Sequence, residues 1–95
     1  MEKTIHATLT FDGNDPLYED HFPGNPVVPG SLVVEAFLNL LQERGVTPLS
    51  VRNFRFRQFI APGSYPCKVV LAEAKASCTL FHGESWAVTG EVVLS

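Results

Sequence analysis

One segment of this chain, residues 31–44, carries apolar side chains around almost its whole circumference when it is arranged as a helix. Four polar residues interrupt this pattern in a single stripe at helical spacing, namely Ser31, Glu35, Asn39 and Gln42. A helix that is apolar on nearly all sides is typically buried. Ser31 is predicted to cap its N-terminus, and Gly45 is predicted to end it. The rest of the chain must therefore pack around this one helix.

The other periodic segments alternate polar and apolar residues, which is typical of strands with one buried face. Alternation is clear over residues 4–11, 52–58 and 86–94, and residues 67–81 hold one long strand or two consecutive strands. One helix followed by consecutive antiparallel strands predicts an α+β fold in which a curved sheet wraps around the helix. Ninety-five residues are enough for one domain, predicted over residues 1–95.

The segment between the first strand and the helix, residues 12–30, holds seven of the chain's fourteen Gly and Pro residues. Prolines stiffen a loop, and the apolar Phe22, Val27 and Val28 indicate that this one packs on the body of the protein. We expect at least one cis or otherwise strained peptide between His21 and Gly30.

Composition excludes several classes of protein. The formal net charge of −3 disfavours nucleic-acid binding, which usually needs a basic excess. The two cysteines, Cys67 and Cys78, lack zinc-site spacing and are predicted to be buried thiols. The chain shows neither a membrane-spanning run nor a signal peptide, so a cytoplasmic location is expected.

Because 45% of the residues are hydrophobic and 18% charged, we expect a homodimer, or a multiple of dimers, to cover part of the surface.

His21 and Glu35 are the residues with the clearest chemical potential. His21 lies in the stiff loop, and Glu35 lies one turn into the helix whose first N–H groups attract negative charge. A base, a carboxyl group and oriented N–H donors suit removal of a proton beside a carbonyl while a neighbouring group leaves. From spacing alone, an exposed Glu35 and an ordinary loop contact of His21 explain the pattern equally well.

Residues 21–30, continued by Leu32, Glu35 and Ala36, resemble the active-site signature of the hotdog-fold 3-hydroxyacyl-[acyl-carrier-protein] dehydratases of bacterial fatty-acid synthesis. Residues 51–57 and 61–63 are similar to the strand and turn that follow the helix in that family. Typical members have a longer N-terminal segment, a glutamine at the position of Asn39 and an apolar residue at that of Ser31. The resemblance implies a hotdog dimer with His21 of one subunit facing Glu35 of the other.

The implied activity is that of a lyase acting in fatty-acid or related lipid, polyketide or polyene synthesis. His21 would be the general base, and Glu35, protonated in an apolar environment, would donate a proton to the departing hydroxyl. By the same resemblance the Val27 carbonyl would orient the His21 ring, and the Gly30 N–H would polarise the thioester carbonyl. The residues expected to bind substrate are Val27, Gly30, Ser31 and Asn39. The substrate would be a thioester of acyl carrier protein or coenzyme A, without metal or organic cofactor.

Two other functions stay open. A hotdog acyl thioesterase would use a carboxylate to direct water and would not need the histidine. A non-catalytic acyl-binding subunit of a synthase would agree with the short N-terminal segment. Phe37, Phe54 and Phe56 are candidate walls of an acyl channel, although core packing explains at least two of them.

Basic residues of one predicted strand are candidates for binding an acidic carrier protein. Arg55 and Arg57 share one face at a spacing of two, and Arg52 and Lys68 are expected nearby. A solvated strand face that keeps a sheet edge from aggregating explains the same pattern equally well.

Overall fold

The computed structural model describes residues 2–13 and 27–95. Within them the elements follow the order β1 (Lys3–Phe11), α2 (Gly30–Glu43), β2 (Pro48–Phe56), β3 (Gly63–Leu71), β4 (Lys75–His82) and β5 (Ser85–Leu94). Residues 67–81 therefore belong to two strands rather than one. His21 lies outside the described residues, as does most of the stretch in which a cis or strained peptide was expected. From Val27 to Gly30 no peptide bond is cis.

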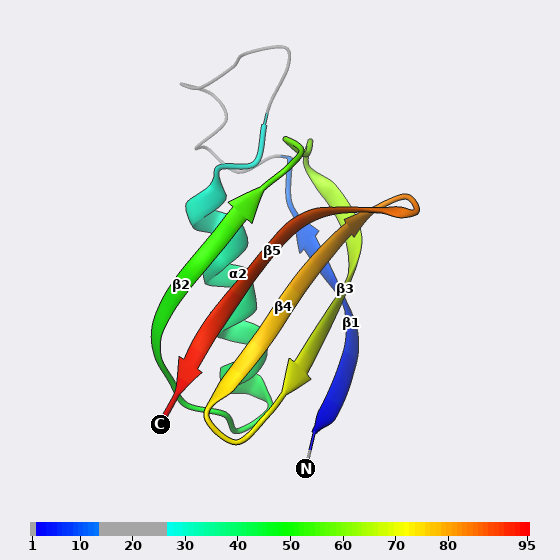
Figure 1. Ribbon diagram of the computed structural model, residues 1–95. Coiled ribbons are helices and arrows are strands. Elements are labelled where there is room, and N and C mark those ends of the chain that lie inside the picture. Colours follow the sequence, from blue (N-terminus) through cyan, green and yellow to red (C-terminus); the bar gives the residue numbers. More distant parts are fainter. Residues whose placement is uncertain (1, 14–26) are drawn as a thin grey trace.

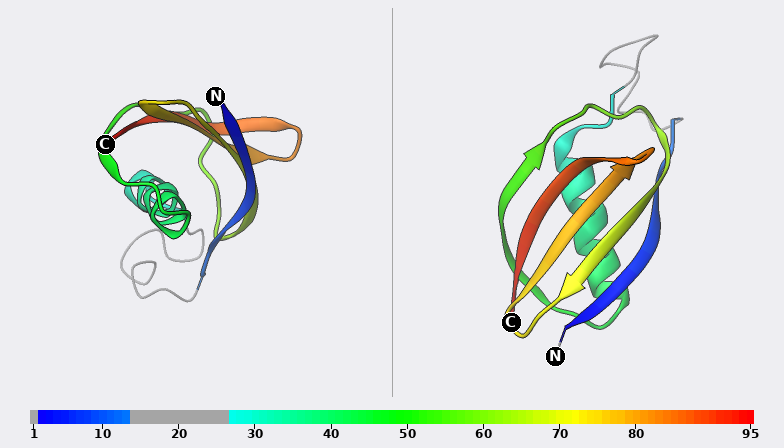
Figure 2. Two further views of the ribbon diagram at one scale, coloured as in Figure 1. Left: turned by 90° about the horizontal axis from the view of Figure 1, so that it is seen from below. Right: turned by 45° about the vertical axis from the view of Figure 1, so that its right-hand side comes forward.

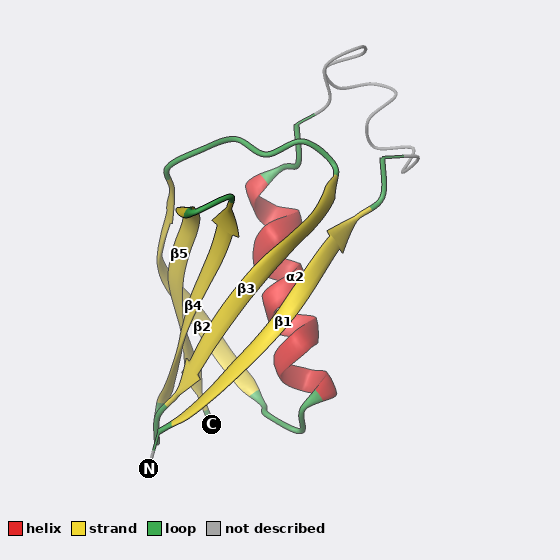
Figure 3. Cartoon of the chain, turned by 90° about the vertical axis from the view of Figure 1, so that its right-hand side faces the viewer, coloured by secondary structure: helices red, strands yellow, loops and turns green. Residues whose placement is uncertain are grey.

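The strands form one antiparallel sheet in the order β1-β3-β4-β5-β2. The sheet curves around α2, which lies on its concave side (Figures 1 and 2). Seen from the side, the sheet and the helix make two layers (Figure 3). This confirms the predicted α+β class and the hotdog arrangement. β1 and β2 are the two edge strands, so each leaves one row of backbone groups without a partner strand in the described chain.

The core lies between the concave face of the sheet and one side of α2. Helix residues Val33, Phe37, Leu40 and Leu41 are buried there. The prediction that α2 is buried on nearly all sides is only partly right, because the sheet covers one side of it. The stripe residues Ser31, Glu35, Asn39 and Gln42 are exposed, and Val34 and Leu38 are half-buried.

Both cysteines are buried free thiols on adjacent strands of the sheet, as predicted. Burial raises the pKa of Cys78 to about 12 and also raises that of Cys67. Each thiol therefore packs as a small apolar side chain.

The two ends of α2 were predicted with unequal success. Gly45 ends the helix as expected, with φ +77° and its N–H donating to the Gln42 carbonyl. The prediction that Ser31 caps the N-terminus is wrong, because α2 begins one residue earlier and Ser31 lies inside its first turn. The N-cap residue is Pro29, whose carbonyl accepts the Leu32 N–H at 3.0 Å, and no side chain caps this end.

Candidate active site

The start of α2 is held against the segment between β2 and β3. The Val28 N–H donates to the Ile60 carbonyl at 2.8 Å, and both side chains are buried. Gly30 lies directly under the Phe56 ring, where a Cβ atom would come within 2.9 Å of Cζ. A larger residue at position 30 would therefore displace the ring or the helix end. Val27 is half-buried beside these residues.

An apolar hollow of about 180 Å³ opens beside Gly30. Its wall combines the residues before and inside the first turn of α2 with the end of β2 and the segment after it. The lining residues are Val28, Gly30, Val33, Phe56, Gln58, Phe59, Ile60 and Val88. The free N–H groups of a helix are at its N-terminus, and Gly30, the first residue of α2, lines this hollow.

Glu35 lies in a second hollow, of about 280 Å³, between α2 and the end of β1. Thr10, Phe11, Asp12, Leu32, Ala36 and Asn39 line it together with Glu35. Glu35 and Asn39 are both exposed. The described chain thus places Gly30 and Glu35 in separate hollows. Within the described residues the Glu35 side chain is exposed, and its role as a proton donor stays a prediction.

Three phenylalanine rings form a row between α2 and β2. The ring centroids of Phe37 and Phe54 lie 6.3 Å apart, and those of Phe54 and Phe56 lie 6.5 Å apart. Phe37 is fully buried, Phe54 packs against the core, and Phe56 is 44% exposed beside Gly30. Core packing therefore accounts for Phe37 and Phe54, whereas Phe56 lines a hollow.

The basic residues predicted to bind a carrier lie on or near the convex face of the sheet. Asn53 adopts a left-handed conformation (φ 57°), and the register of β2 on β5 shifts between Arg52 and Arg55. This irregularity brings Arg52 and Arg55 to the same face despite their spacing of three. Arg55 lines a hollow of about 420 Å³ there, together with Asn53 and the hydroxyl residues Ser77, Thr79 and Thr89.

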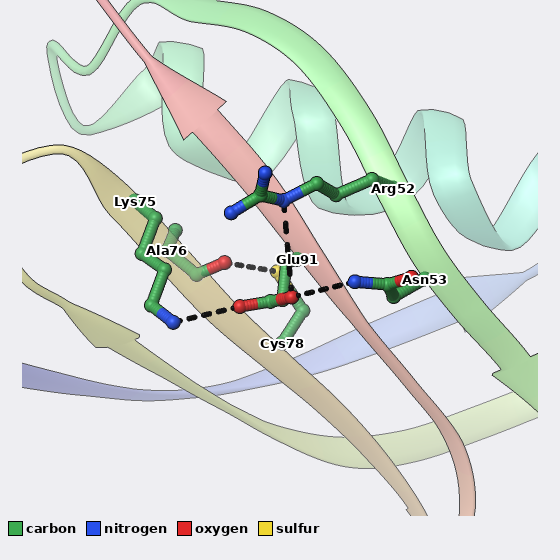
Figure 4. Close-up of polar contacts among 6 residues, drawn as sticks. All are labelled: Arg52, Asn53, Lys75, Ala76, Cys78 and Glu91. Carbon is green, nitrogen blue, oxygen red and sulfur yellow. Dashed lines mark hydrogen bonds and ion pairs between the residues drawn. The ribbon is translucent and has the colours of Figure 1, made fainter.

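Glu91 engages part of this basic group (Figure 4). Its carboxylate accepts hydrogen bonds from Lys75 Nζ at 2.8 Å and Asn53 Nδ2 at 3.0 Å, and Arg52 Nε lies 3.9 Å away. The Lys75 and Asn53 hydrogen bonds, followed by the charges of Lys75 and Arg52, lower the pKa of Glu91 to about 2. Arg52 is thus already paired with an anion.

Lys68 and Arg57 lie apart from Arg55. Lys68 is aligned with Thr79, Thr79 with Thr89, and Thr89 with Arg55, so three strand spacings of about 4.8 Å separate Lys68 from Arg55. The expectation that Lys68 is close to the arginines is therefore wrong. Arg57 follows the end of β2 and stacks on Trp86, with its guanidinium carbon 5.3 Å from the ring centroid.

Comparison with known proteins identifies the family. A sequence model of the ApeI-like family, described as ApeI dehydratase, matches residues 1–89. The chain belongs to this family. Two solved structures share its fold: an uncharacterized protein from Erwinia carotovora subsp. atroseptica (TM-score 0.77, 22% identity, 99% of this chain and 84% of that one) and the dehydratase heterocomplex ApeI:P from Xenorhabdus doucetiae (TM-score 0.73, 19% identity, 99% and 93%).

Curated relatives include 3-hydroxyacyl-[acyl-carrier-protein] dehydratases named FabZ. The protein from Caldicellulosiruptor saccharolyticus is 36% identical over 94 residues, and that from Caulobacter sp. is 35% identical over 83 residues. These alignments cover 84% and 74% of this chain but 64% and 51% of the relatives. The ApeI-like chain thus spans between half and two thirds of their length.

Two further observations bear on the chemistry of this ApeI-like protein. Among residues 2–13 and 27–95, no group of three or more His, Cys, Asp and Glu side chains could hold a metal ion. In the same residues no helix has the length and apolar character needed to cross a membrane. The absence of a metal or organic cofactor stays a prediction.

Sequence reasoning missed contacts at this end of the molecule. Neither Tyr65 nor His82 belongs to a motif that singles it out. Both bind the segment that supports the start of α2: Tyr65 donates to the Ala61 carbonyl, and His82 contacts Gln58. Gln58 and His82 are 24 positions apart in the sequence, and no periodic signal could have revealed this contact.

Proposed function

We propose that this protein removes water from 3-hydroxyacyl thioesters and releases trans-2-enoyl thioesters. The observation that carries the proposal is the position of Glu35, a carboxylic acid in an open hollow of α2, in a chain that belongs to a dehydratase family. We also propose that residues 1–95 form one hotdog domain. The predicted partner of Glu35 is His21, fourteen residues earlier in the family's signature.

The proposed reaction is a proton abstraction coupled to loss of a hydroxyl group. His21 takes a proton from C2, the C2–H electron pair forms the C2=C3 double bond, and the C3–O bond breaks. Glu35 gives its proton to the departing hydroxyl, which leaves as water. The Gly30 N–H at the start of α2 would stabilise the negative charge that develops on the thioester oxygen. The Val27 carbonyl would orient the His21 ring, and Ser31 and Asn39 would contact the substrate.

We infer that two copies of the chain complete each site. The edge strand β2 and the segment after it expose large apolar side chains: Leu49 (66%), Val51 (43%), Phe56 (44%) and Phe59 (85%). Exposed apolar residues along a free sheet edge favour pairing with a second edge. A dimer through β2 would continue the sheet across two subunits and cover apolar surface. It would also allow Glu35 of one subunit to meet Gly30 and His21 of the other.

A second candidate is a subunit that is active only beside a different hotdog chain. The observation that favours it is the structure from Xenorhabdus doucetiae, which is a dehydratase heterocomplex. In that case the β2 edge would bind the other chain, and His21 and Glu35 would serve different sites. Light scattering on the purified chain separates the two candidates, because a homodimer requires twice the 10.4 kDa chain mass without any added partner.

The activity test follows enoyl absorbance and free thiol together after addition of a 3-hydroxyacyl thioester. A dehydratase raises the enoyl signal, whereas a thioesterase releases thiol and a non-catalytic subunit changes neither. His21→Ala and Glu35→Gln should each lower turnover by at least about 100-fold, the usual contribution of a general acid or base. Glu43→Gln, which alters another exposed glutamate of α2, is the matched control. Near-normal turnover of either site variant would contradict the mechanism.

The proposed carrier of the substrate is an acyl carrier protein bound through Arg55 and Arg57. Arg55 lines the convex hollow, and Arg57 directly follows β2, which ends at the end of the sheet at which α2 starts (Figure 1). Arg52 contributes less because Glu91 already engages it, and Lys68 is too far across the sheet to act with them. Arg55→Glu with Arg57→Glu should raise KM for carrier-bound substrate, most strongly at low salt. An equal effect on a small coenzyme A thioester would contradict this docking proposal.

A further inference from the structure

The segment that joins β2 to β3, residues 57–62 and here called the connector, lies at the same end of the molecule as the start of α2 (Figure 1). Its Ile60 side chain is 2% exposed and anchors the connector in the core. The Ile60 carbonyl accepts the Val28 N–H at 2.8 Å. The proposed site uses two backbone groups, the Val27 carbonyl and the Gly30 N–H. Because Val28 lies between these two residues, the position of the Ile60 carbonyl sets where both groups lie.

Two side chains from the sheet bind the connector on either side of Ile60. The Tyr65 hydroxyl donates to the Ala61 carbonyl at 2.6 Å. On the other side, His82 Nδ1 lies 3.1 Å from Gln58 Oε1, and it must donate because an amide oxygen can only accept.

Tyr65 and His82 also contact one another. Their ring centroids lie 5.6 Å apart with an angle of 78° between the planes, an edge-to-face arrangement. Tyr65 further packs on Phe11, whose side chain is buried in the core (centroids 6.5 Å apart). The two contacts with the connector therefore come from one mutually supported pair rather than from independent surface side chains.

The fold does not depend on this pair to bring the connector onto the sheet. The N–H groups of Arg57 and Gln58 both donate to the Ala87 carbonyl, and burial of Ile60 holds the middle of the connector. A single exposed hydrogen bond adds little to folding stability. What the pair adds is orientation, since it holds the Ala61 carbonyl on one side of Ile60 and the Gln58 side chain on the other.

We propose that Tyr65 and His82 are positioning residues for the proposed dehydration, a role that rests on that function. By holding the connector, they keep the Ile60 carbonyl in place and through it the Val27 carbonyl and the Gly30 N–H. Small displacements of groups that orient a base or bind a developing charge reduce turnover strongly. Substrate binding, which depends largely on the acyl group and its carrier, changes little.

The test removes each hydrogen bond while keeping an aromatic ring at each position. Tyr65→Phe loses the donor to Ala61, and His82→Phe loses the donor to Gln58. In each variant we expect the Val28 amide to exchange with deuterium about fivefold faster or more, as expected for loss of a supporting hydrogen bond, while global stability stays near that of the parent. The kcat should fall about fivefold or more, with KM changed less than twofold.

Ser64→Ala is the matched control. It removes the exposed Thr10–Ser64 hydrogen bond of 2.9 Å, one residue from Tyr65, without touching the connector. Both Val28 exchange and kcat should stay at the parent values in this variant.

Unchanged Val28 exchange in Tyr65→Phe and His82→Phe overturns the proposal, and so does faster exchange with an unchanged kcat. If one variant fails to fold, the other decides. A parent protein without dehydratase activity overturns the proposed function instead, and Val28 exchange then still decides whether the pair positions this backbone.

Discussion

Gly90 is the position at which one added methyl group should disturb the core most. It lies on the concave side of β5, directly beneath the ring of Phe54. A Cβ atom built on Gly90 would overlap three atoms of that ring, Cγ, Cδ1 and Cδ2. The ring cannot move freely, because it packs between Phe37 and Phe56. Gly90→Ala therefore forces a shift of β2 relative to α2 and β5.

Two opposing effects set the magnitude. An alanine in a strand interior is favoured over glycine by about 0.5–1 kcal/mol because it loses less backbone entropy. Insertion of a methyl group into a packed core costs about 1–3 kcal/mol. Since the overlap involves the rigid part of an aromatic ring, the steric cost should prevail by about 1–2 kcal/mol. For a domain of this size, that lowers Tm by about 5–15 °C.

Thermal unfolding followed by circular dichroism at one fixed protein concentration measures this effect, since Tm of a dimer depends on concentration. Gly13→Ala is the control, because its Cβ would meet Pro62 at an ordinary 3.4 Å. Adding Phe54→Leu to Gly90→Ala should recover part of the loss, so that the two substitutions are less than additive. A Tm within 2 °C of the parent, or full additivity with Phe54→Leu, would refute the steric argument.

Three further outcomes are expected. Because the folded-state pKa of Glu91 is lowered to about 2 from its ordinary value of 4.5, the stability that its contacts give is present above pH 4.5 and is lost as the pH falls toward 2. Plots of Tm against pH for the parent and Glu91→Gln should therefore converge over that range, and parallel plots would contradict the assignment. Gly30→Ala should lower dehydratase turnover while leaving Tm near that of the parent, because its Cβ would push on Phe56, a partly exposed ring that can shift. A clear fall in Tm with unchanged turnover would mean that the glycine serves mainly the fold. The Cys78 thiol, with its pKa raised to about 12, should react with a disulfide reagent at pH 8 far more slowly in the native protein than in denaturant, and equal rates would show that it is accessible.

The proposed site was only partly predictable from the sequence. The spacing of Glu35 from Gly30 follows from the helical pattern, and the structure places both on α2. Whether they share one hollow does not follow from spacing, because that depends on which sides of the helix the sheet leaves uncovered. The contacts of Tyr65 and His82 with the connector likewise join residues of different strands to a segment that has no periodicity.

The sequence by itself determined the elements and their apolar faces. Helical and alternating periodicity are local properties, and they identified α2, β1 and β5. The helix end at Gly45 and the buried thiols of Cys67 and Cys78 followed from residue type and spacing, which are local properties as well. Strand order was decided by the tertiary structure, since an alternating pattern records which face of a strand is apolar but not which strand pairs with it. Pairing with β5 places β2 at the edge, and the irregularity at Asn53 turns Arg52 to the same face as Arg55. Both depend on backbone hydrogen bonds between distant segments. Every residue has the carbonyl acceptor and every residue except proline has the N–H donor, so these bonds leave no mark in the sequence.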